Sequence, residues 1–376
     1  MLKNEGVEVS WFAPLCNGDD EFLGEHNPKY KSNWVNTMKI VKTADKLGYK
    51  NILLPSSYQV GQDTLTFASA IAPMVKNINL LIAIRCGEIH PPMLAKAIAT
   101  LDHILEGKLT INIISSDLPG TKLSSKERYL KSKEVIEILN QSWTKNKIDF
   151  KGDFYNLQIP SDPVKPYQKG GPLLYFGGYS PEGIDLCAKY CNVYLMWPET
   201  ETRLKKMIYK MKKKAAGYNR QIAFGLRIHV IVRKTELEAK KYAKKLISKL
   251  DIAKGDEIRN RSQDSKSIGV SRQKEMRLIS DENYYLEDNI WTGIGLARSG
   301  CGAAIVGNPE QVLNKINRYI DMGIKSFILS GYPNKKEAEL FAKFVLPKIK
   351  NVSLPVVFNR IPKKTPNTPL ANGKRN

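Results

Sequence analysis

The most constraining feature of this 376-residue chain is a repeated alternation of short apolar runs with amphipathic stretches. Eight runs rich in aliphatic and β-branched residues predict strands at 7–13, 51–54, 79–84, 109–114, 173–176, 193–197, 223–232 and 326–329. Between them apolar residues recur at helical spacing, as in Leu94, Ile98 and Leu101. Strands separated by helices pair in parallel, because parallel neighbours need long crossover connections. A doubly wound sheet also satisfies this pattern, but eight repeats in a chain of this length favour an α/β fold of the (β/α)8 TIM barrel type.

The helix expected after the seventh predicted strand has well-defined ends. Asn308 can cap its first turn, Pro309 suits the first helical position, and Gln311 stands three residues after the cap. Gly323 stands where a left-handed C-terminal cap is expected. These signals support the helix assignments.

Two segments interrupt the alternation and are interpreted as insertions. Residues 145–171 contain a hairpin-like signal, and residues 251–288 are polar without sustained periodicity. From about residue 355 apolar residues become too sparse to order the chain. We therefore expect one barrel domain over 1–354 and a flexible tail over 355–376.

The composition is that of a protein with a large hydrophobic core. Hydrophobic residues make up 42% of the chain and charged residues 26%, which argues against wholesale disorder or a fibrous repeat. No apolar run approaches the roughly 20 residues that span a bilayer, and the N-terminus lacks a secretory signal pattern. A soluble, cytoplasmic protein is expected.

The five cysteines do not form a recognisable framework. Their number is odd and they are scattered along the chain, which argues against structural disulfides. Cys187 and Cys191 lie four apart in an expected helix, but no histidine or second cysteine pair nearby completes a metal site. Buried thiols are the better interpretation, and no metal is expected.

The formal net charge of +22 has two interpretations. Nucleic-acid binding requires basic residues gathered along one groove, often with stacking aromatic residues between them. The lysines here fall mostly on the polar faces of amphipathic helices, which face outward in a barrel. We favour a solvated exterior and expect no nucleic-acid partner.

In an α/β barrel the chemistry lies at the C-terminal ends of the strands. After the fifth predicted strand, Gly177 and Gly178 lead into a helix that Ser180 can cap. Two glycines allow close approach of a ligand, and the exposed N–H groups of a helix N-terminus suit a phosphate. Taken alone, the same pattern also describes a tight turn.

A second set of polar residues gathers near the later strands. Arg227 and His229 are two apart in a strand, so both side chains project to the same side. They are either a polar core layer paired with carboxylates or part of a binding site. With Arg298 and Tyr332 at the ends of later elements, they would form a site for an oxyanion such as sulfonate, phosphate or carboxylate.

The chain resembles the bacterial-luciferase-like flavin monooxygenases, and most closely the reduced-FMN-dependent alkanesulfonate monooxygenase. The resemblance runs from about residue 9 to about residue 355. Its segments include His90-Pro-Pro-Met-Leu-Ala-Lys96, Glu127-Arg-Tyr129 and Leu174-Tyr-Phe-Gly-Gly178. The segments typical of the sulfonate branch are Phe224-Gly-Leu-Arg-Ile-His229, Asn289-Ile-Trp-Thr-Gly-Ile-Gly-Leu-Ala-Arg298 and Phe327-Ile-Leu-Ser-Gly-Tyr-Pro333.

The resemblance implies a (β/α)8 barrel in a two-component system. A separate NAD(P)H-dependent reductase would supply reduced FMN, and with O2 this chain would convert a small organosulfonate to an aldehyde and sulfite. A dimer or tetramer is implied. The polar segment near 251–288 would be a mobile lid that excludes water.

The resemblance also assigns roles to individual residues. Arg227 and Arg298 would hold the anion, His229 and Tyr332 would act in proton transfer and hydrogen bonding, and Trp197 would form a wall of the flavin pocket. The cofactor and its phosphate would be framed by Asn112, Ser115, Arg128, Tyr129, Gly177, Gly178, Tyr179 and Ser180.

Three departures from the family pattern leave the identity of the sulfonate open. Residues 56–63 lack the usual cysteine, Cys16 stands in a Leu-Cys-Asn-Gly-Asp segment where the family has Thr-His-Gly-Asp, and Tyr179 replaces a serine. Two alternatives therefore remain. One is a related monooxygenase acting on a sulfone, an amine or a biosynthetic intermediate, and the other is a catalytically silent flavin-binding barrel.

Overall fold

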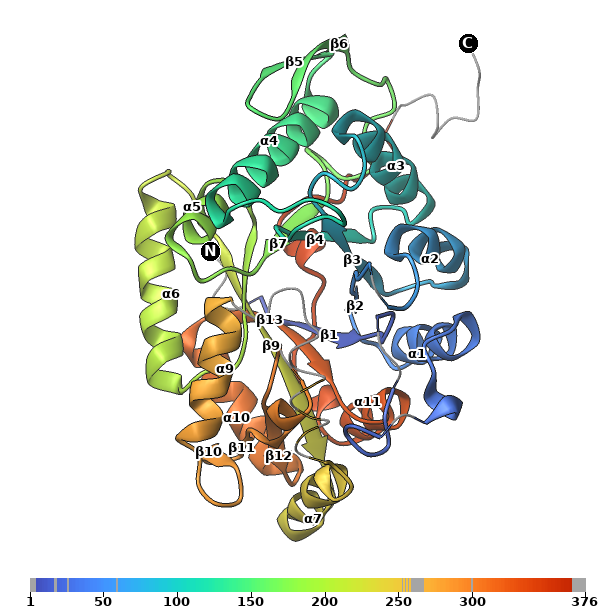
Figure 1. The fold of residues 1–376 in the computed structure, drawn as a ribbon. Coiled ribbons are helices and arrows are strands. Elements are labelled where there is room, and N and C mark those ends of the chain that lie inside the picture. The colour runs from blue at the N-terminus through green and yellow to red at the C-terminus, as the bar shows by residue number, and fades with distance from the viewer. Residues whose placement is uncertain are drawn as a thin grey trace.

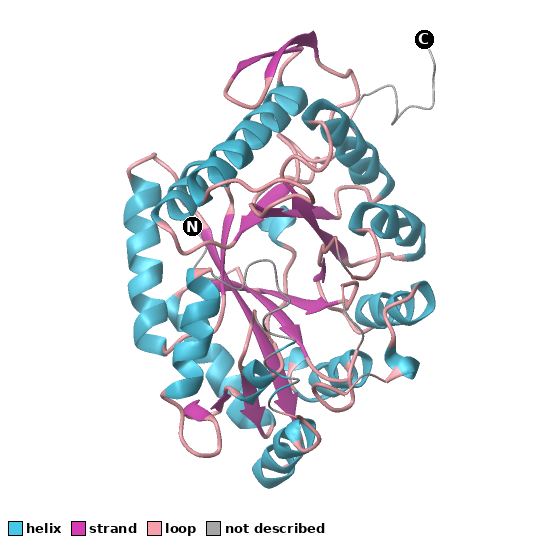
Figure 2. Cartoon of the chain, in the orientation of Figure 1, coloured by secondary structure: helices cyan, strands magenta, loops and turns pink. Residues whose placement is uncertain are grey.

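Eight parallel strands close into a ring, and helices surround them (Figures 1 and 2). The computed structural model describes residues 5–16, 19–25, 27–58, 60–251, 253, 255, 257, 267–298 and 300–366. The barrel strands are β1 (Glu8–Phe12), β2 (Asn51–Leu54), β3 (Asn79–Arg85), β4 (Leu109–Ile114), β7 (Leu173–Phe176), β8 (Val193–Met196), β9 (Ala223–Val232) and β13 (Ile324–Ser330). The ring closes because β13 pairs with both β1 and β9, and β9 pairs with β8. The predicted barrel and its eight strands are confirmed.

The helices bury the apolar faces that their sequence spacing predicts. In α6, for example, Leu204, Ile208 and Met211 are all buried. Helix α10 begins after the Asn308 cap and ends at Gly323, whose φ of 104° lies in the left-handed region. The longer helices are α1 (Trp34–Lys46), α2 (Thr64–Ile71), α3 (Pro91–Ile104), α4 (Ser125–Thr144), α5 (Pro181–Tyr190), α6 (Glu201–Ala216), α7 (Glu236–Ile247), α9 (Ile268–Leu278), α10 (Pro309–Met322) and α11 (Asn334–Phe344).

The sheet continues beyond the barrel along the second half of β9. Strand β8 pairs only with 223–226 of β9, so the later backbone groups of this ten-residue strand require another partner. Strand β12 (Ala304–Gly307) supplies it in parallel, and β11 (Ile290–Trp291) and β10 (Tyr285–Glu287) extend the sheet antiparallel. No strand was expected at 304–307.

Both insertions are present, with one correction. The first forms the predicted hairpin, β5 (Lys147–Lys151) with β6 (Asn156–Pro160). The second was expected to lack regular structure, but it contains the eleven-residue helix α9. The helix was missed because it buries only a narrow stripe that includes Gly269, Gln273 and Met276, so apolar periodicity is weak. Residues 252, 254, 256 and 258–266 of this segment lie outside the described residues.

The expected tail begins with ordered structure. The boundary at 355 falls inside the short helix α12 (Leu354–Val357). Just beyond it, the Arg360 carbonyl accepts a hydrogen bond from the Lys169 backbone N–H at 2.8 Å. Residues 367–376 lie outside the described residues.

Polar side chains close the end of the barrel where the strands begin. The Glu8 carboxylate accepts hydrogen bonds from Tyr175 Oη at 2.6 Å and Ser326 Oγ at 3.0 Å, and all three residues are buried. Burial raises the pKa of Glu8. Side chains therefore fill the barrel interior at this end, and the catalytic chemistry of such barrels lies at the opposite end, where the strands finish.

Candidate active site

Arg227, His229, Arg298 and Tyr332 lie together at the C-terminal ends of the barrel strands. Arg298 Nε donates a hydrogen bond to Tyr332 Oη at 2.5 Å, and the His229 and Tyr332 rings stack with centroids 5.3 Å apart. Arg227 and His229 lie on β9. Tyr332 follows β13, the strand that pairs with β9. The predicted proximity of these four side chains is confirmed; their roles remain proposals.

The Arg227 guanidinium is a buried cation whose positive charge is only weakly offset by the groups around it. Its Nη1 donates to the Ile228 and Ile328 carbonyls over 3.3 and 3.4 Å, and it lies 4.5 Å from the centre of the Phe12 ring. Within the described part of the chain no carboxylate lies within 4 Å of it. Burial, together with the nearby charge of Arg298, lowers the pKa of Arg227. Such a buried cation favours an anionic ligand.

His229 is held in its neutral form. Burial, followed by the positive charges of Arg227 and Arg298, lowers the pKa of His229 well below its usual value. Its Nδ1 lies 2.7 Å from Ser330 Oγ, which orients the ring. The imidazole can therefore take up a proton once an anion offsets the two guanidinium charges.

The glycine turn after β7 packs closely against β8. A Cβ on Gly177 would lie 2.9 Å from the Leu195 carbonyl oxygen, so this position cannot easily carry a side chain. The Gly178 carbonyl accepts from Tyr194 Oη at 2.8 Å, which fixes the turn. Ser180 caps α5 by accepting from the Gly183 N–H at 3.1 Å, as predicted.

Helix α4 brings two predicted cofactor residues to this turn. A Cβ on Gly183 would lie 3.1 Å from Tyr129 Oη, so Tyr129 packs on the first turn of α5. Arg128 Nη1 donates to the Leu123 carbonyl at 2.7 Å and lies 3.5 Å from Asp117 Oδ1, whereas its buried Nε has no hydrogen-bond partner in the described structure. That N–H group suits an oxyanion. The turn and the start of α4 therefore fit the phosphate end of a flavin nucleotide.

The two remaining predicted cofactor residues, Asn112 and Ser115, lie on β4 and just after its end. Asn112 is half-buried on the strand itself. Ser115 Oγ donates to Ser132 Oγ at 2.6 Å, so this hydroxyl is bonded within the protein. Ser115 therefore supports α4, and nothing in its bonding indicates a ligand.

Trp197 and Tyr179 form an aromatic wall that α9 covers. The Trp197 backbone N–H donates to Tyr179 Oη at 2.8 Å, and the two rings are 6.4 Å apart. A Cβ on Gly269, at the start of α9, would lie 2.9 Å from the Trp197 ring and 3.0 Å from the Tyr179 ring. Gln273 fastens the helix by donating to the Pro198 carbonyl at 2.9 Å and accepting from the Gly302 N–H at 3.0 Å.

Three residues at this end were not singled out as site residues by the sequence reasoning. Arg85 ends β3, where its Nη2 donates to the Ser56 carbonyl at 2.9 Å, Nη1 bonds Ser116 Oγ, and the buried Nε has no partner in the described structure. Cys16 lies near both Arg85 and Arg298, whose charges oppose the burial that raises the pKa of its thiol to about 12. Cys301 Sγ donates to the Arg227 carbonyl at 3.2 Å. The position of Arg85 at a strand end was the available signal.

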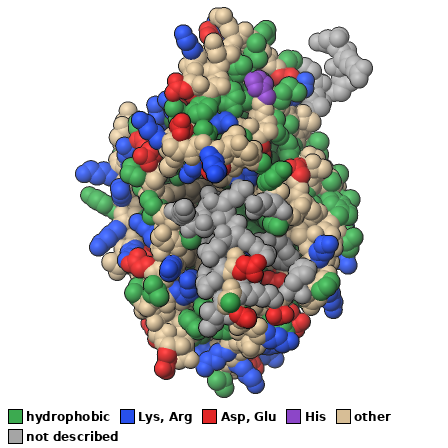
Figure 3. Space-filling model, viewed as in Figure 1, with side chains coloured by type: hydrophobic (Ala, Val, Ile, Leu, Met, Phe, Trp, Pro, Cys, Tyr) green, Lys and Arg blue, Asp and Glu red, His purple; other side chains and the backbone are tan. Residues whose placement is uncertain are grey.

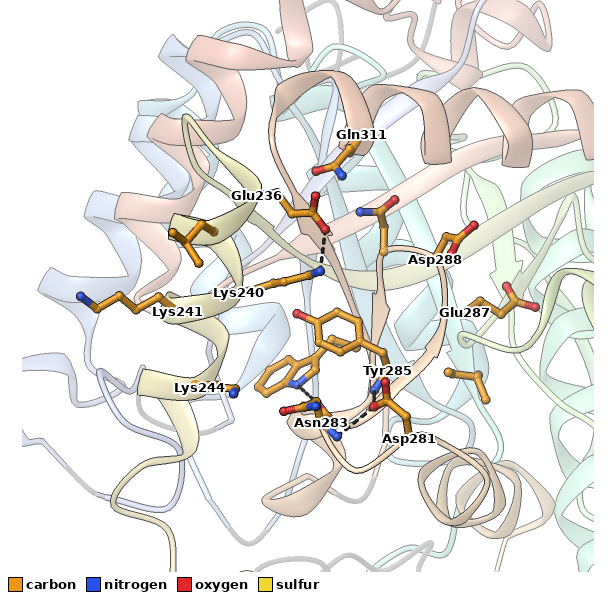
Figure 4. Close-up of a pocket in the computed structure, with 14 residues that line it drawn as sticks. Glu236, Lys240, Lys241, Lys244, Asp281, Asn283, Tyr285, Glu287, Asp288 and Gln311 are labelled. Atoms are coloured by element: carbon orange, nitrogen blue, oxygen red, sulfur yellow. Dashed lines mark hydrogen bonds and ion pairs between the residues drawn. The ribbon is translucent and has the colours of Figure 1, made fainter.

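A separate groove lies on the side of the molecule, between α7 and the β10–β11 hairpin (Figure 4). Its volume is about 960 Å³. Two of its charged side chains, Lys240 and Glu236, form an ion pair at 2.6 Å. It includes none of the predicted site residues.

In the described part of the chain, neither the surface charges nor the cysteines indicate a second binding or metal site. On the face in Figure 3 the basic side chains are spread around the rim, with acidic side chains among them. Cys187 and Cys191 are buried thiols. Among the described residues no three metal-ligating side chains gather, and none of the helices there is long and apolar enough to cross a membrane.

The chain is similar to known proteins in both sequence and fold. Residues 7–326 match a family described as luciferase-like monooxygenase. The chain is 52% identical to a sulfoquinovose monooxygenase of Agrobacterium fabrum over 99% of this chain and 97% of the relative, and 46% identical to a protein of that name from Novosphingobium aromaticivorans over 93% and 98%. Its fold matches the oxygenating constituent of 3,6-diketocamphane monooxygenase from Pseudomonas putida, solved with FMN, with a TM-score of 0.68 and 18% identity over 92% of this chain and 99% of that one.

Proposed function

This chain belongs to the luciferase-like monooxygenase family, and we propose that it uses reduced FMN and O2 to cleave the carbon–sulfur bond of sulfoquinovose, a hexose sulfonated at carbon 6. Sulfonate, O2 and reduced FMN would give the carbon-6 aldehyde, hydrogensulfite, oxidised FMN and water. An NAD(P)H-dependent FMN reductase would supply the reduced flavin. The dimer or tetramer expected from the sequence stays a prediction.

The observation that carries this proposal is the buried, weakly compensated guanidinium of Arg227. A sulfonate would offset the cost of burying this charge and could accept hydrogen bonds from both Arg227 and Arg298. The two guanidiniums flank the same aromatic pair, because Arg298 bonds Tyr332 Oη and the Tyr332 ring stacks on His229, two residues from Arg227 on β9. Two neighbouring cations favour a group that distributes one negative charge over several oxygens.

The relatives narrow the substrate class. Two of them, at 52% and 46% identity over nearly the whole chain, are named for sulfoquinovose. The small organosulfonate expected from the sequence is thereby refined to a sulfonated sugar as the favoured substrate. A sugar has hydroxyl groups that require partners, and the unsatisfied Arg85 Nε offers one such donor near the rim.

The residues around the glycine turn fit FMN. Gly177, Gly178 and the N-terminus of α5 would receive the phosphate, Arg128 would donate its unpartnered Nε–H, and the Trp197–Tyr179 wall would border the ring system. When bound, reduced FMN supplies the electrons that activate O2.

The protein's own side chains would then control protons and water. The neutral imidazole of His229, oriented by Ser330 Oγ at Nδ1, would accept the proton lost from carbon 6. Tyr332 Oη, which accepts from Arg298, would donate its own hydrogen to a sulfonate oxygen. Helix α9 lies over Trp197 and would limit the access of water.

Sulfite release tests the proposal directly. The protein is incubated with an FMN reductase, NADH, FMN and O2, and sulfite is measured with sulfoquinovose, hexanesulfonate, dimethyl sulfone and glucose in parallel. We expect sulfite from sulfoquinovose with a higher kcat/KM than from hexanesulfonate, and none from glucose. Absence of sulfite with every sulfonate would contradict desulfonation, and a clear preference for hexanesulfonate would contradict the sugar substrate.

A further inference from the structure

A polar pocket lies at the opposite end of the barrel from the candidate active site. Its lining comes from segments next to the starts of the strands: Pro172 and Leu174 at β7, Asn192 before β8 and Arg220 before β9. Helices α4 and α5 contribute Asn140, Trp143, Lys189 and Tyr190, and Gly170 and Arg360 complete it. This pocket, the floor pocket, is distinct from the site at the strand ends.

Three cations line the floor pocket without an acidic partner. Among the described residues no carboxylate oxygen lies within 4 Å of Lys189, Arg220 or Arg360. The lining contains no Asp or Glu. Two acidic side chains in this region are engaged elsewhere, because Asp185 binds Lys214 at 2.6 Å and Glu137 accepts from Tyr190 Oη.

The two guanidiniums are fixed in place but keep unused donors. Arg220 donates to the Ala188 and Cys191 carbonyls at 2.9 and 2.7 Å, and so covers the C-terminus of α5. Arg360 Nη1 donates to the Lys169 carbonyl at 2.6 Å. A guanidinium has five N–H groups, so both retain donors beyond these bonds. Burial, followed by the positive charge of Arg220, lowers the pKa of Arg360.

We propose that the floor pocket binds a doubly charged tetrahedral oxyanion, sulfate or phosphate, between Arg220, Arg360 and Lys189. The pocket volume of about 200 Å³ is several times the roughly 30 Å³ that one water occupies in the liquid, so a small oxyanion fits with accompanying water. Asn140 and the side-chain amide N–H2 of Asn192 can add uncharged donors, since Asn192 Oδ1 already accepts from the Leu174 N–H at 2.9 Å.

The anion would connect the C-terminal segment to the barrel. Arg360 follows α12, Arg220 follows α6, and Lys189 lies in the last turn of α5. An ion bound by all three would relieve their mutual repulsion and would bind the folded protein only, so it would raise the unfolding temperature. This inference does not depend on the proposed oxygenation.

Calorimetric titration and thermal unfolding with sodium sulfate and sodium phosphate, at constant ionic strength set by chloride, test the proposal. We expect saturable binding and a rise in the unfolding temperature. Arg360→Gln should weaken the affinity by about tenfold, because it removes a charge-assisted hydrogen bond. Lys189→Gln, which changes an exposed side chain, should also weaken the affinity for the anion and should leave sulfite release unchanged.

Two controls separate this site from other anion sites. Lys210→Gln alters an exposed lysine of α6 outside the pocket and should leave the affinity unchanged. Arg298→Ala disrupts the anion site at the other end and should leave floor binding intact. Equal affinity and stabilisation in wild type, Lys189→Gln and Arg360→Gln would overturn the proposal, as would absence of sulfate and phosphate binding to wild type.

Discussion

At the scale of single residues, Arg227 illustrates how one buried charge can define a site. It lies on a central barrel strand, is 7% exposed, and has no carboxylate within 4 Å in the described chain. Burying an unpaired guanidinium costs several kcal/mol, so the fold tolerates it only if a ligand or a functional gain offsets that cost. Its position beside His229 and near Arg298 makes an anion the simplest ligand.

We expect Arg227→Gln to weaken recognition of the sulfonate. Removing one partner of a buried charge pair costs about 2–5 kcal/mol, on the order of 30-fold to several thousand-fold in kcat/KM. Steady-state sulfite release and reduced-flavin binding are measured together, with Lys210→Gln as the surface control. Flavin affinity should stay near that of wild type, and a parallel loss of flavin binding would argue that Arg227 holds the cofactor instead.

At the scale of elements, α9 is attached to the barrel by Gln273, by the ion pairs of Arg272 with Glu199 and Glu275 with Arg203, and by the buried Met276. Gln273 bonds both to the Pro198 carbonyl and to the Gly302 N–H, and Gly269 lies against the Trp197 and Tyr179 rings. The two Gln273 hydrogen bonds contribute about 1–3 kcal/mol in total to holding α9 in place. Its position over the aromatic wall suits a cover for the site.

Gln273→Ala should therefore loosen α9 and admit water. The expected result is less sulfite formed per O2 consumed, with the rate of reduced-flavin oxidation maintained. Both quantities are measured in one assay with an oxygen electrode and a sulfite dye. Lys274→Ala, on the exposed side of the same helix, serves as the control. An unchanged sulfite-to-oxygen ratio in Gln273→Ala would show that α9 does not protect the reaction.

At the scale of the whole molecule, buried carboxyl groups link stability to pH. Asp102 on α3 accepts from the Gln168 backbone N–H and side-chain amide at 2.8 Å each, and so attaches the first insertion to the barrel. Burial raises the pKa of Asp102 to about 7, although the Gln168 bonds oppose it. Because an unfolded Asp has a pKa of about 3.9, the neutral form is favoured on folding; this contribution is complete below about pH 4 and is lost as the pH rises to about 7.

Asp102→Asn should remove this pH dependence. The free energy of unfolding of the variant, relative to wild type, should increase as the pH rises from 4 to 7.5, whatever its sign at low pH. Urea denaturation at several pH values measures it, with the exposed Asp149→Asn as control. A difference between Asp102→Asn and wild type that stays constant across this range would contradict the raised pKa.

The sequence predicted those features of the candidate site that depend on residues close together in the chain. Arg227 and His229 share a side because strand residues two apart must do so, and Ser180 caps α5 because serine, proline and glycine stand at the required positions. Arg85 and Cys301 were missed because each approaches the site from a loop or strand end whose direction depends on neighbouring strands. Ser115 was assigned to the cofactor, but its hydroxyl bonds Ser132 from α4.

The sequence by itself determined the alternation of strands and helices, the ends of α10 and the apolar faces, because these depend on residues within a few positions of one another. Only the tertiary structure decided which strand covers the second half of β9, that α9 lies over Trp197, and that Arg220 and Arg360 share a pocket. Such contacts join residues dozens to more than a hundred positions apart. The spacing of residues along the sequence does not predict these contacts, because they form only when the barrel closes.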